Sequence, residues 1–175
     1  MDDLLAELAV LLRKRDDFDA RIAQLTGRSA RSSDVGEFIA SRVFDIELAD
    51  TATQAGYDGR FRSGSLAGRT VNIKLYGNAL DGLDIALHPS DFYLVLSGSR
   101  PATGSVGHHR WHIAQVFLFQ ADRLRIKLDE RGVKIGTATS LRKSDLAAAE
   151  IYPTSFNDSP LHLTAQQQQQ LALFT

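Results

Sequence analysis

The sequence predicts an α/β fold in which a central mixed β-sheet is flanked by helices. Segments with the helical spacing of apolar residues lie at both ends of the chain, and strand-like segments lie between them. The predicted order is helix, hairpin, buried strand, strand and helix, which is typical of a sheet covered by helices. A length of 175 residues with 43% hydrophobic residues suits one compact domain with an additional helix or two.

The first predicted helix runs from Asp2 to about Gln24. Its seam follows a 4-3-4-3 spacing over about three heptads, with one polar member: Leu4, Leu8, Leu11, Arg15, Phe18, Ile22 and Leu25. Such a seam is compatible with an arm that pairs with a second copy of the chain to give a homodimer. It is also compatible with a helix packed on its own domain. Three heptads are too few to decide, and we expect the packed helix.

A second helix is expected after a linker, residues 26–33, that is rich in Gly, Ser and Arg. Asp34 is the expected N-cap, and Glu37 three residues later completes a capping-box pattern. The apolar stripe of this helix consists of Val35, Phe38, Ile39 and Val43. We expect the helix to end near Asp45.

A β-hairpin is expected next. Residues 55–61 form its first strand, residues 63–68 its turn and residues 70–76 its second strand, and the Gly and Ser content of the turn supports this interpretation. Side chains alternate across a strand. One face of the second strand therefore carries Asn72, Lys74 and Tyr76, and the other carries Val71, Ile73 and Leu75.

The remaining elements are expected from shorter patterns. The apolar run Phe92–Leu96 predicts a buried central strand, and residues 112–119 predict another. Residues 121–131 fit both strand alternation and helical spacing, so their structure stays open. Two further helices are expected, at residues 141–150 and 164–174.

Several polar residues are expected to converge at one edge of the hairpin. Asp58 on the first strand lies beside the polar face of the second strand, which carries Asn72 and Lys74. Glu37 reaches the same edge from the preceding helix. Hydrolysis of a phosphodiester bond uses hard oxygen ligands to hold Mg²⁺ and a lysine near the attacking water. The backbone carbonyl of Ile73 is a further candidate ligand.

These residues resemble the PD-(D/E)XK nuclease superfamily. The resemblance rests on Gly36-Glu37, on Gly56-Tyr57-Asp58 and on Asn72-Ile73-Lys74, in that order along the chain. With residues 131–140 and 149–153, the chain looks closest to a group of uncharacterised bacterial restriction-endonuclease-like domains. The resemblance spans roughly residues 34–153.

The resemblance implies a catalytic site with a bound metal ion. Asp58 and Glu37 would be catalytic metal ligands, Lys74 the catalytic lysine, and Mg²⁺, or alternatively Mn²⁺, the cofactor. Asn72 departs from the pattern, because the superfamily usually has Asp or Glu there, and a neutral amide oxygen should bind Mg²⁺ more weakly than a carboxylate. The expected function is a Mg²⁺-dependent DNA endonuclease. The alternative is a catalytically weak or inactive nuclease-fold module that binds nucleic acid or a protein partner.

Composition restricts the partners. The net charge of −1 is not that of a protein that coats nucleic acid. A stretch between residues 110 and 143 holds eight basic residues against three acidic ones, so Arg110, Arg142 and Lys143 are candidate DNA contacts, with a solvated mixed-charge face as the alternative. The absence of cysteine excludes disulfides and thiolate chemistry and fits a reducing cytoplasm. No apolar run approaches the roughly 20 residues of a membrane span.

Three segments are therefore expected. Residues 1–30 hold the N-terminal helix as a candidate dimerisation arm, residues 31–155 a PD-(D/E)XK-like domain, and residues 156–175 a C-terminal loop and helix.

The site residues also have simpler interpretations. Asp58 precedes a glycine and is compatible with a turn aspartate, Glu37 with a helix cap, and Lys74 with a solvated strand residue.

Overall fold

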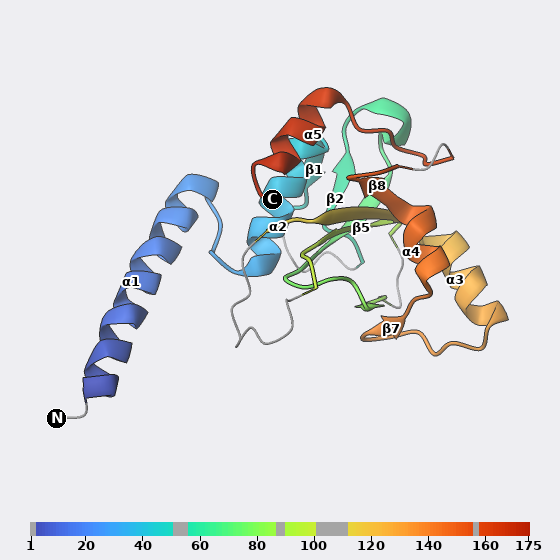
Figure 1. Cartoon of the computed structure of the whole chain (residues 1–175). Coiled ribbons are helices and arrows are strands. Elements are labelled where there is room, and N and C mark those ends of the chain that lie inside the picture. Colours follow the sequence, from blue (N-terminus) through green and yellow to red (C-terminus); the bar gives the residue numbers. More distant parts are fainter. Residues whose placement is uncertain (1–2, 51–55, 87–89, 101–111, 156–157) are drawn as a thin grey trace.

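The structure, a computed structural model, describes residues 3–50, 56–86, 90–100, 112–155 and 158–175. At its centre is a six-stranded sheet with the order β1-β2-β3-β5-β6-β8 (Figure 1). Its strands are β1 (Ile46–Leu48), β2 (Gly59–Phe61), β3 (Thr70–Tyr76), β5 (Phe92–Ser97), β6 (Gln115–Gln120) and β8 (Glu150–Tyr152). A small second sheet pairs β4 (Gly82–Leu83) with β7 (Thr139–Ser140). Since β3 and β5 are parallel and the other neighbours antiparallel, the predicted mixed sheet is confirmed.

Helices cover both faces of this sheet. The helices are α1 (Asp3–Thr26), α2 (Ser32–Val43), α3 (Ala121–Glu130), α4 (Lys143–Ala149) and α5 (Ala165–Ala172), with a 3₁₀ turn, η1, at Gly64–Leu66. On one face, α2 and α5 pack against apolar side chains of the strands, and on the other face α3 and α4 do so. Figure 1 shows these two helical layers on either side of the strands. The α/β architecture follows the predicted one.

Side-chain alternation in the strands produces two separate cores. Val71 and Ile73 of β3 face α2 and join a core that includes Ile39. Tyr93 and Phe117, from β5 and β6, belong to the second core beneath α3. Every residue of β5 is buried, as expected for a central strand that is covered on both faces.

The hairpin of β2 and β3 is the element that the sequence predicts best. β3 has the predicted bounds, and the turn contains η1. β2 begins four residues later than predicted, at Gly59, which is paired with Val71. Asp58 precedes the strand, yet its N–H still donates to the carbonyl oxygen of Val71 at 2.9 Å. The backbone hydrogen bonds between the two halves of the hairpin therefore extend to Asp58, a residue of the candidate site.

The start of α2 differs from the prediction. The helix begins at Ser32, and its N-cap is Arg31, in an extended conformation, instead of Asp34. The Asp34 carboxylate instead accepts a hydrogen bond from the Ser29 hydroxyl. The capping-box prediction is therefore wrong, and the Glu37 carboxylate is available for another partner.

Two further differences concern short or ambiguous segments. β1 follows α2 directly, because Asp45 adopts a left-handed conformation (φ 52°) that ends the helix and redirects the chain. The sequence analysis does not predict this three-residue strand. Residues 121–131, left open, are helical from Ala121 to Glu130, with Leu124 and Leu128 buried against the sheet.

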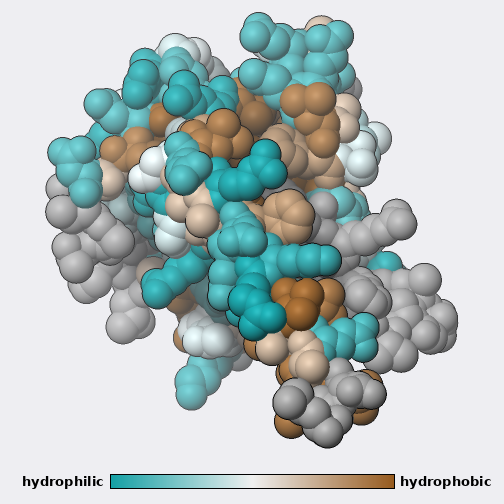
Figure 2. All heavy atoms as spheres, turned by 90° about the vertical axis from the view of Figure 1, so that its left-hand side faces the viewer, coloured by the Kyte–Doolittle hydropathy of each residue, from teal (hydrophilic) through white to brown (hydrophobic). Residues whose placement is uncertain are grey.

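α1 lies apart from the sheet and its covering helices (Figure 1). Its large apolar side chains are exposed, and the expected packing on its own domain is wrong: Leu4, Leu5, Leu8, Val10, Leu11, Leu12, Phe18, Ile22 and Leu25. Figure 2 views the molecule from the side that carries α1, where apolar and polar surfaces alternate. Among the described residues, no helix combines the length and apolarity that crossing a membrane requires.

A close contact fixes α2 on β3 beside the candidate site. A Cβ atom placed on Gly36 would lie 2.8 Å from the Cβ of Leu75, closer than packed carbon atoms approach. Glycine at this position therefore lets the helix rest directly on the strand. The neighbouring residue, Glu37, is brought close to the sheet as a result.

Candidate functional site

Asp58 is fixed beside the second strand of the hairpin. Its Oδ2 accepts a hydrogen bond from the N–H of Ile73 at 2.6 Å. Burial raises the pKa of the Asp58 carboxyl, and the opposing effects are this hydrogen bond and the positive charges of Lys74 and Arg28. The aspartate lies in the bend before β2 and is a half-buried group whose carboxylate is tied to β3.

Glu37 of α2 lies in the same electrostatic environment. Burial raises the pKa of its carboxyl, the nearby Arg28 guanidinium lowers it, and the charge of Asp58 raises it further. The charge of Asp58 thus acts on the Glu37 carboxyl, which makes the two carboxylates candidate members of one site.

Arg28 belongs to the candidate site and is not predicted from the sequence. Its Nη2 donates to Oε2 of Glu37 at 2.5 Å, and its charge lowers the pKa of both carboxyls. Its Nε is buried and has no hydrogen-bond partner in the described part of the chain. The backbone N–H of Arg28 donates to Oγ1 of Thr26 at 3.2 Å, which ties the linker to the end of α1. The Arg-rich composition of the linker was the available signal.

Asn72 and Lys74 are the candidate site residues on β3. The Lys74 ammonium is close enough to lower the pKa of Asp58. The side chain of Asn72 is buried, and within the described residues its Oδ1 accepts no hydrogen bond. An unpaired buried oxygen costs about 1–3 kcal/mol. Such an oxygen is suited to a ligand that is not part of the chain.

Ile73 contributes backbone groups to the same place. In a strand, the N–H and the C=O of one residue point to the same side. Since the N–H of Ile73 bonds to Asp58, the carbonyl oxygen of Ile73 is directed to the β2 side of β3 as well. Because Gly59, the first residue of β2, is paired with Val71, Ile73 lies beyond the end of the β2 pairing, opposite the residues that precede β2.

The candidate ligands are of the type that binds a hard cation, but they are few. Two carboxylates, an amide oxygen and a backbone carbonyl are all oxygen donors, which Mg²⁺ prefers, with waters completing its shell. Among the described residues, however, no group of three or more His, Cys, Asp or Glu side chains is arranged to hold a metal ion. Within the described part of the chain, the cation paired with Glu37 is Arg28.

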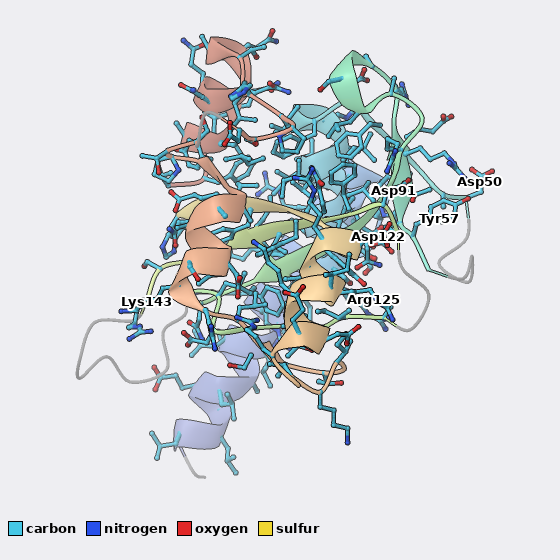
Figure 3. All side chains as sticks on the ribbon, turned by 90° about the vertical axis from the view of Figure 1, so that its right-hand side faces the viewer. Asp50, Tyr57, Asp91, Asp122, Arg125 and Lys143 are labelled. Atoms are coloured by element: carbon cyan, nitrogen blue, oxygen red, sulfur yellow. The ribbon has the colours of Figure 1, made fainter. Side chains whose placement is uncertain are left out.

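The predicted nucleic-acid residues lie elsewhere or outside the described chain. Arg142 and Lys143 are exposed at the beginning of α4. Figure 3 shows Lys143 at the opposite side of the molecule from Tyr57, the neighbour of Asp58. Arg110 lies outside the described residues. The structure therefore does not bring Arg142 and Lys143 to the carboxylate pair.

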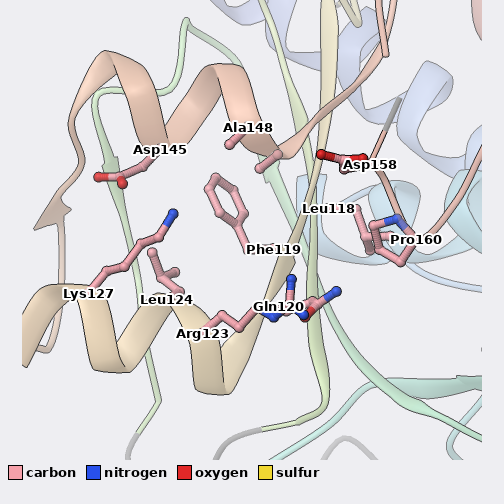
Figure 4. A pocket seen from close by; sticks show the side chains of 11 residues that line it. Leu118, Phe119, Gln120, Arg123, Leu124, Lys127, Asp145, Ala148, Asp158 and Pro160 are labelled. Carbon is pink, nitrogen blue, oxygen red and sulfur yellow. The ribbon is translucent and has the colours of Figure 1, made fainter. Parts of the chain in front are cut away.

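A second pocket lies between α3 and α4, on the sheet face opposite to α2 (Figure 4). Its charged side chains are of both signs, with Arg123 and Lys127 facing a lining that includes Asp145 and Asp158. Asp145 is already paired with Arg131 at 2.9 Å. With its charges balanced and one acid engaged, this pocket is a weaker candidate site.

Comparison with known proteins gives no family or relative from which a function could be inferred. No protein-family model matches the chain, and no curated protein is significantly similar to it in sequence. The pairing of Glu37 with Arg28 and the electrostatic environment of Asp58 therefore carry the functional inference.

The raised pKa of Asp58 predicts how its charge affects stability. A carboxyl whose folded pKa is raised binds its proton more tightly in the folded state, so stability falls as pH rises from the unfolded pKa through the folded pKa. Asp58→Asn removes this charge and keeps an oxygen acceptor for the Ile73 N–H. We expect the variant to have a higher Tm than wild type near pH 7, and the gain to vanish below the ordinary aspartate pKa of 3.8.

Thermal unfolding followed by circular dichroism across this pH range measures the effect. Asp19→Asn is the matched control, because Asp19 is an exposed aspartate of α1. It should leave Tm nearly unchanged. A lower Tm for Asp58→Asn at pH 7 would mean that the ionised carboxylate stabilises the fold.

Proposed function

We propose that the chain is a Mg²⁺-dependent endonuclease of the PD-(D/E)XK type that hydrolyses phosphodiester bonds of DNA. The observation that carries this proposal is that the charges of Asp58 and Glu37 interact and that the charge of Lys74 acts on Asp58, at the beginning of the hairpin. These residues come from a helix, from the position just before β2 and from β3, in the order that the superfamily pattern requires. The buried oxygen of Asn72, which accepts no hydrogen bond within the described residues, is a further candidate ligand.

Each residue has a definite role in this proposal. Glu37 and Asp58 would hold the cation, assisted by Oδ1 of Asn72 and the carbonyl oxygen of Ile73. When bound, Mg²⁺ neutralises phosphate charge and lowers the pKa of a bound water. The Lys74 ammonium, beside Asp58, would orient the attacking water and stabilise the negative charge that develops on the phosphate.

A second candidate function follows from Arg28. Its guanidinium already neutralises Glu37, and Asn72 replaces the usual acidic ligand, so a cation would find fewer negative charges than in a typical site. On this basis the chain would be a catalytically weak or inactive nuclease-fold module that binds nucleic acid or a protein partner. Whether it cleaves DNA separates the two candidates.

A cleavage assay tests the proposal. Purified wild-type protein is incubated with plasmid, linear duplex and single-stranded DNA in Mg²⁺ or Mn²⁺, beside Asp58→Ala, Lys74→Ala and the control Arg123→Ala. We expect cleavage by wild type and by the control, and a loss of at least about 100-fold in both site variants, the size typical of losing an electrostatic catalytic group. Equal activity in all four proteins would refute the assignment, and no activity in any would favour the binding module.

We also propose that α1 pairs with the α1 helix of a second copy, giving a homodimer. The supporting observation is the exposure of its heptad seam, in which Leu4, Phe18 and Leu25 are 74%, 62% and 80% exposed. A contiguous apolar stripe of this extent on a monomer is unusual and marks an association surface. A matching stripe on an identical helix is its simplest complement.

Association through α1 is tested by placing a charge in the seam. Leu11→Glu should convert a dimer to a monomer in analytical ultracentrifugation, because two buried glutamates would face an apolar seam. The domain should keep its Tm, since Leu11 is 55% exposed within one chain. Glu7→Gln, a change at a polar position of the same helix, serves as the control. A wild-type monomer at tens of micromolar would exclude this dimer.

A further inference from the structure

A groove beside the candidate site is lined by arginines from three separate segments. Arg28 comes from the linker, Arg42 from α2 and Arg62 from the residues that follow β2. The rest of its lining includes Phe38 and Ile46, which are apolar. The groove thus lies over the outer side of α2 and the edge strand β1.

The groove has an excess of positive charge. Among the described residues, neither Arg42 nor Arg62 forms an ion pair with a carboxylate, and both side chains are exposed. The carboxylate in the lining is that of Asp45, and it accepts a hydrogen bond from the Ser63 hydroxyl at 2.6 Å. Arg28 is paired with Glu37, so the charge excess of the groove rests on Arg42 and Arg62, which face the single carboxylate of Asp45.

The arginines combine with an apolar floor. The guanidinium of Arg42 lies over the ring of Phe38, 5.4 Å from its centre, and this contact holds the charge in place. Leu48 joins Phe38 and Ile46 in the lining. Such a surface offers charges for phosphates and apolar contact for sugars or bases, a combination suited to a nucleic-acid strand.

Arg28 connects this groove to the carboxylate pair. The same guanidinium that lines the groove donates to Glu37 at 2.5 Å and lowers the pKa of Asp58. A polymer lying along the groove would therefore pass directly beside Glu37 and Asp58. We propose that the groove of Arg28, Arg42 and Arg62 binds the phosphodiester backbone of DNA.

The choice of DNA rests on the proposed function of the neighbouring site. Guanidinium groups bind carboxylates as well as phosphates in a bidentate manner. On charge alone, an acidic protein segment would therefore fit the groove as well as DNA does. The groove adjoins the site at which we propose that a phosphodiester bond is hydrolysed, and this continuity favours DNA. The experiment separates the two ligands.

Binding is measured in EDTA, so that its outcome does not depend on a metal or on cleavage. Fluorescence anisotropy with a labelled duplex and a labelled single strand compares wild type with the double variant Arg42→Ala/Arg62→Ala. The matched control is Arg123→Ala/Lys127→Ala on α3, which removes the same two positive charges from the opposite sheet face. Tm is recorded for each protein, and Arg42→Lys/Arg62→Lys tests whether restoring the charge restores binding.

We expect the groove variant to bind at least one of the two DNA forms about tenfold more weakly, the control to bind like wild type, and the lysine variant to recover most of the affinity. The slope of log K against log salt should fall by about two in the groove variant, because two phosphate contacts are lost. Equal losses in the groove and control variants would overturn the proposal, as would absence of binding in wild type. Competition by poly-glutamate as strong as that by unlabelled DNA would point to an acidic protein instead.

The outcomes also separate this proposal from the proposed activity. If DNA binding depends on the groove but wild type does not cleave DNA in Mg²⁺, the groove proposal stands and the nuclease proposal is refuted. If the groove variant cleaves DNA and binds it with unchanged affinity, the groove proposal is refuted and the nuclease proposal stands.

Discussion

The contact of Arg28 with Glu37 is the interaction on which the candidate site depends. Two half-buried carboxylates close to one another lose hydration and repel, and both effects raise the pKa of Glu37, whose neighbour is Asp58. The Arg28 guanidinium, 2.5 Å from Glu37, opposes both effects. Removing one partner of such a partly buried pair leaves the other charge uncompensated. The path of the linker from α1 to α2 is set by this contact together with the bond from Arg28 to Thr26.

The charges around the pair balance without a bound ion. Glu37 and Asp58 carry two negative charges, and Arg28 and Lys74 supply two positive ones. Asn72 is neutral and adds no charge to this set. A metal ion would have to compete with Arg28 for Glu37.

The sequence predicts the elements whose pattern is local and repeated. Side-chain alternation identifies β3 with its observed bounds, and an unbroken apolar run identifies β5. It also selects Glu37 and Asp58 as candidate site residues, from their positions on the helix and at the hairpin. The short strand β1 is missed, since three residues carry too little pattern and its start depends on the left-handed backbone of Asp45. The exposed seam of α1 shows no signal that distinguishes it from a buried one.

The missed functional residues share one physical reason. Glu37 has a plausible local explanation as part of a capping box, which conceals its contact with Arg28 nine residues earlier. The arginines of the groove come from a linker, a helix and a turn, and only the folded chain brings them together. Predictions from the basic stretch near Arg142 and Lys143 follow charge along the sequence, whereas a binding surface depends on charge in space.

The competition between Arg28 and a cation is tested most directly by calorimetric titration with Mn²⁺. Arg28→Gln removes the guanidinium from Glu37, and Arg31→Gln removes a neighbouring exposed arginine as the control. The account predicts that Arg28→Gln binds Mn²⁺ about tenfold more tightly than wild type, equivalent to about 1.4 kcal/mol, while Arg31→Gln is unchanged. Unchanged or weaker Mn²⁺ binding by Arg28→Gln would show that the arginine does not occupy the position of a cation.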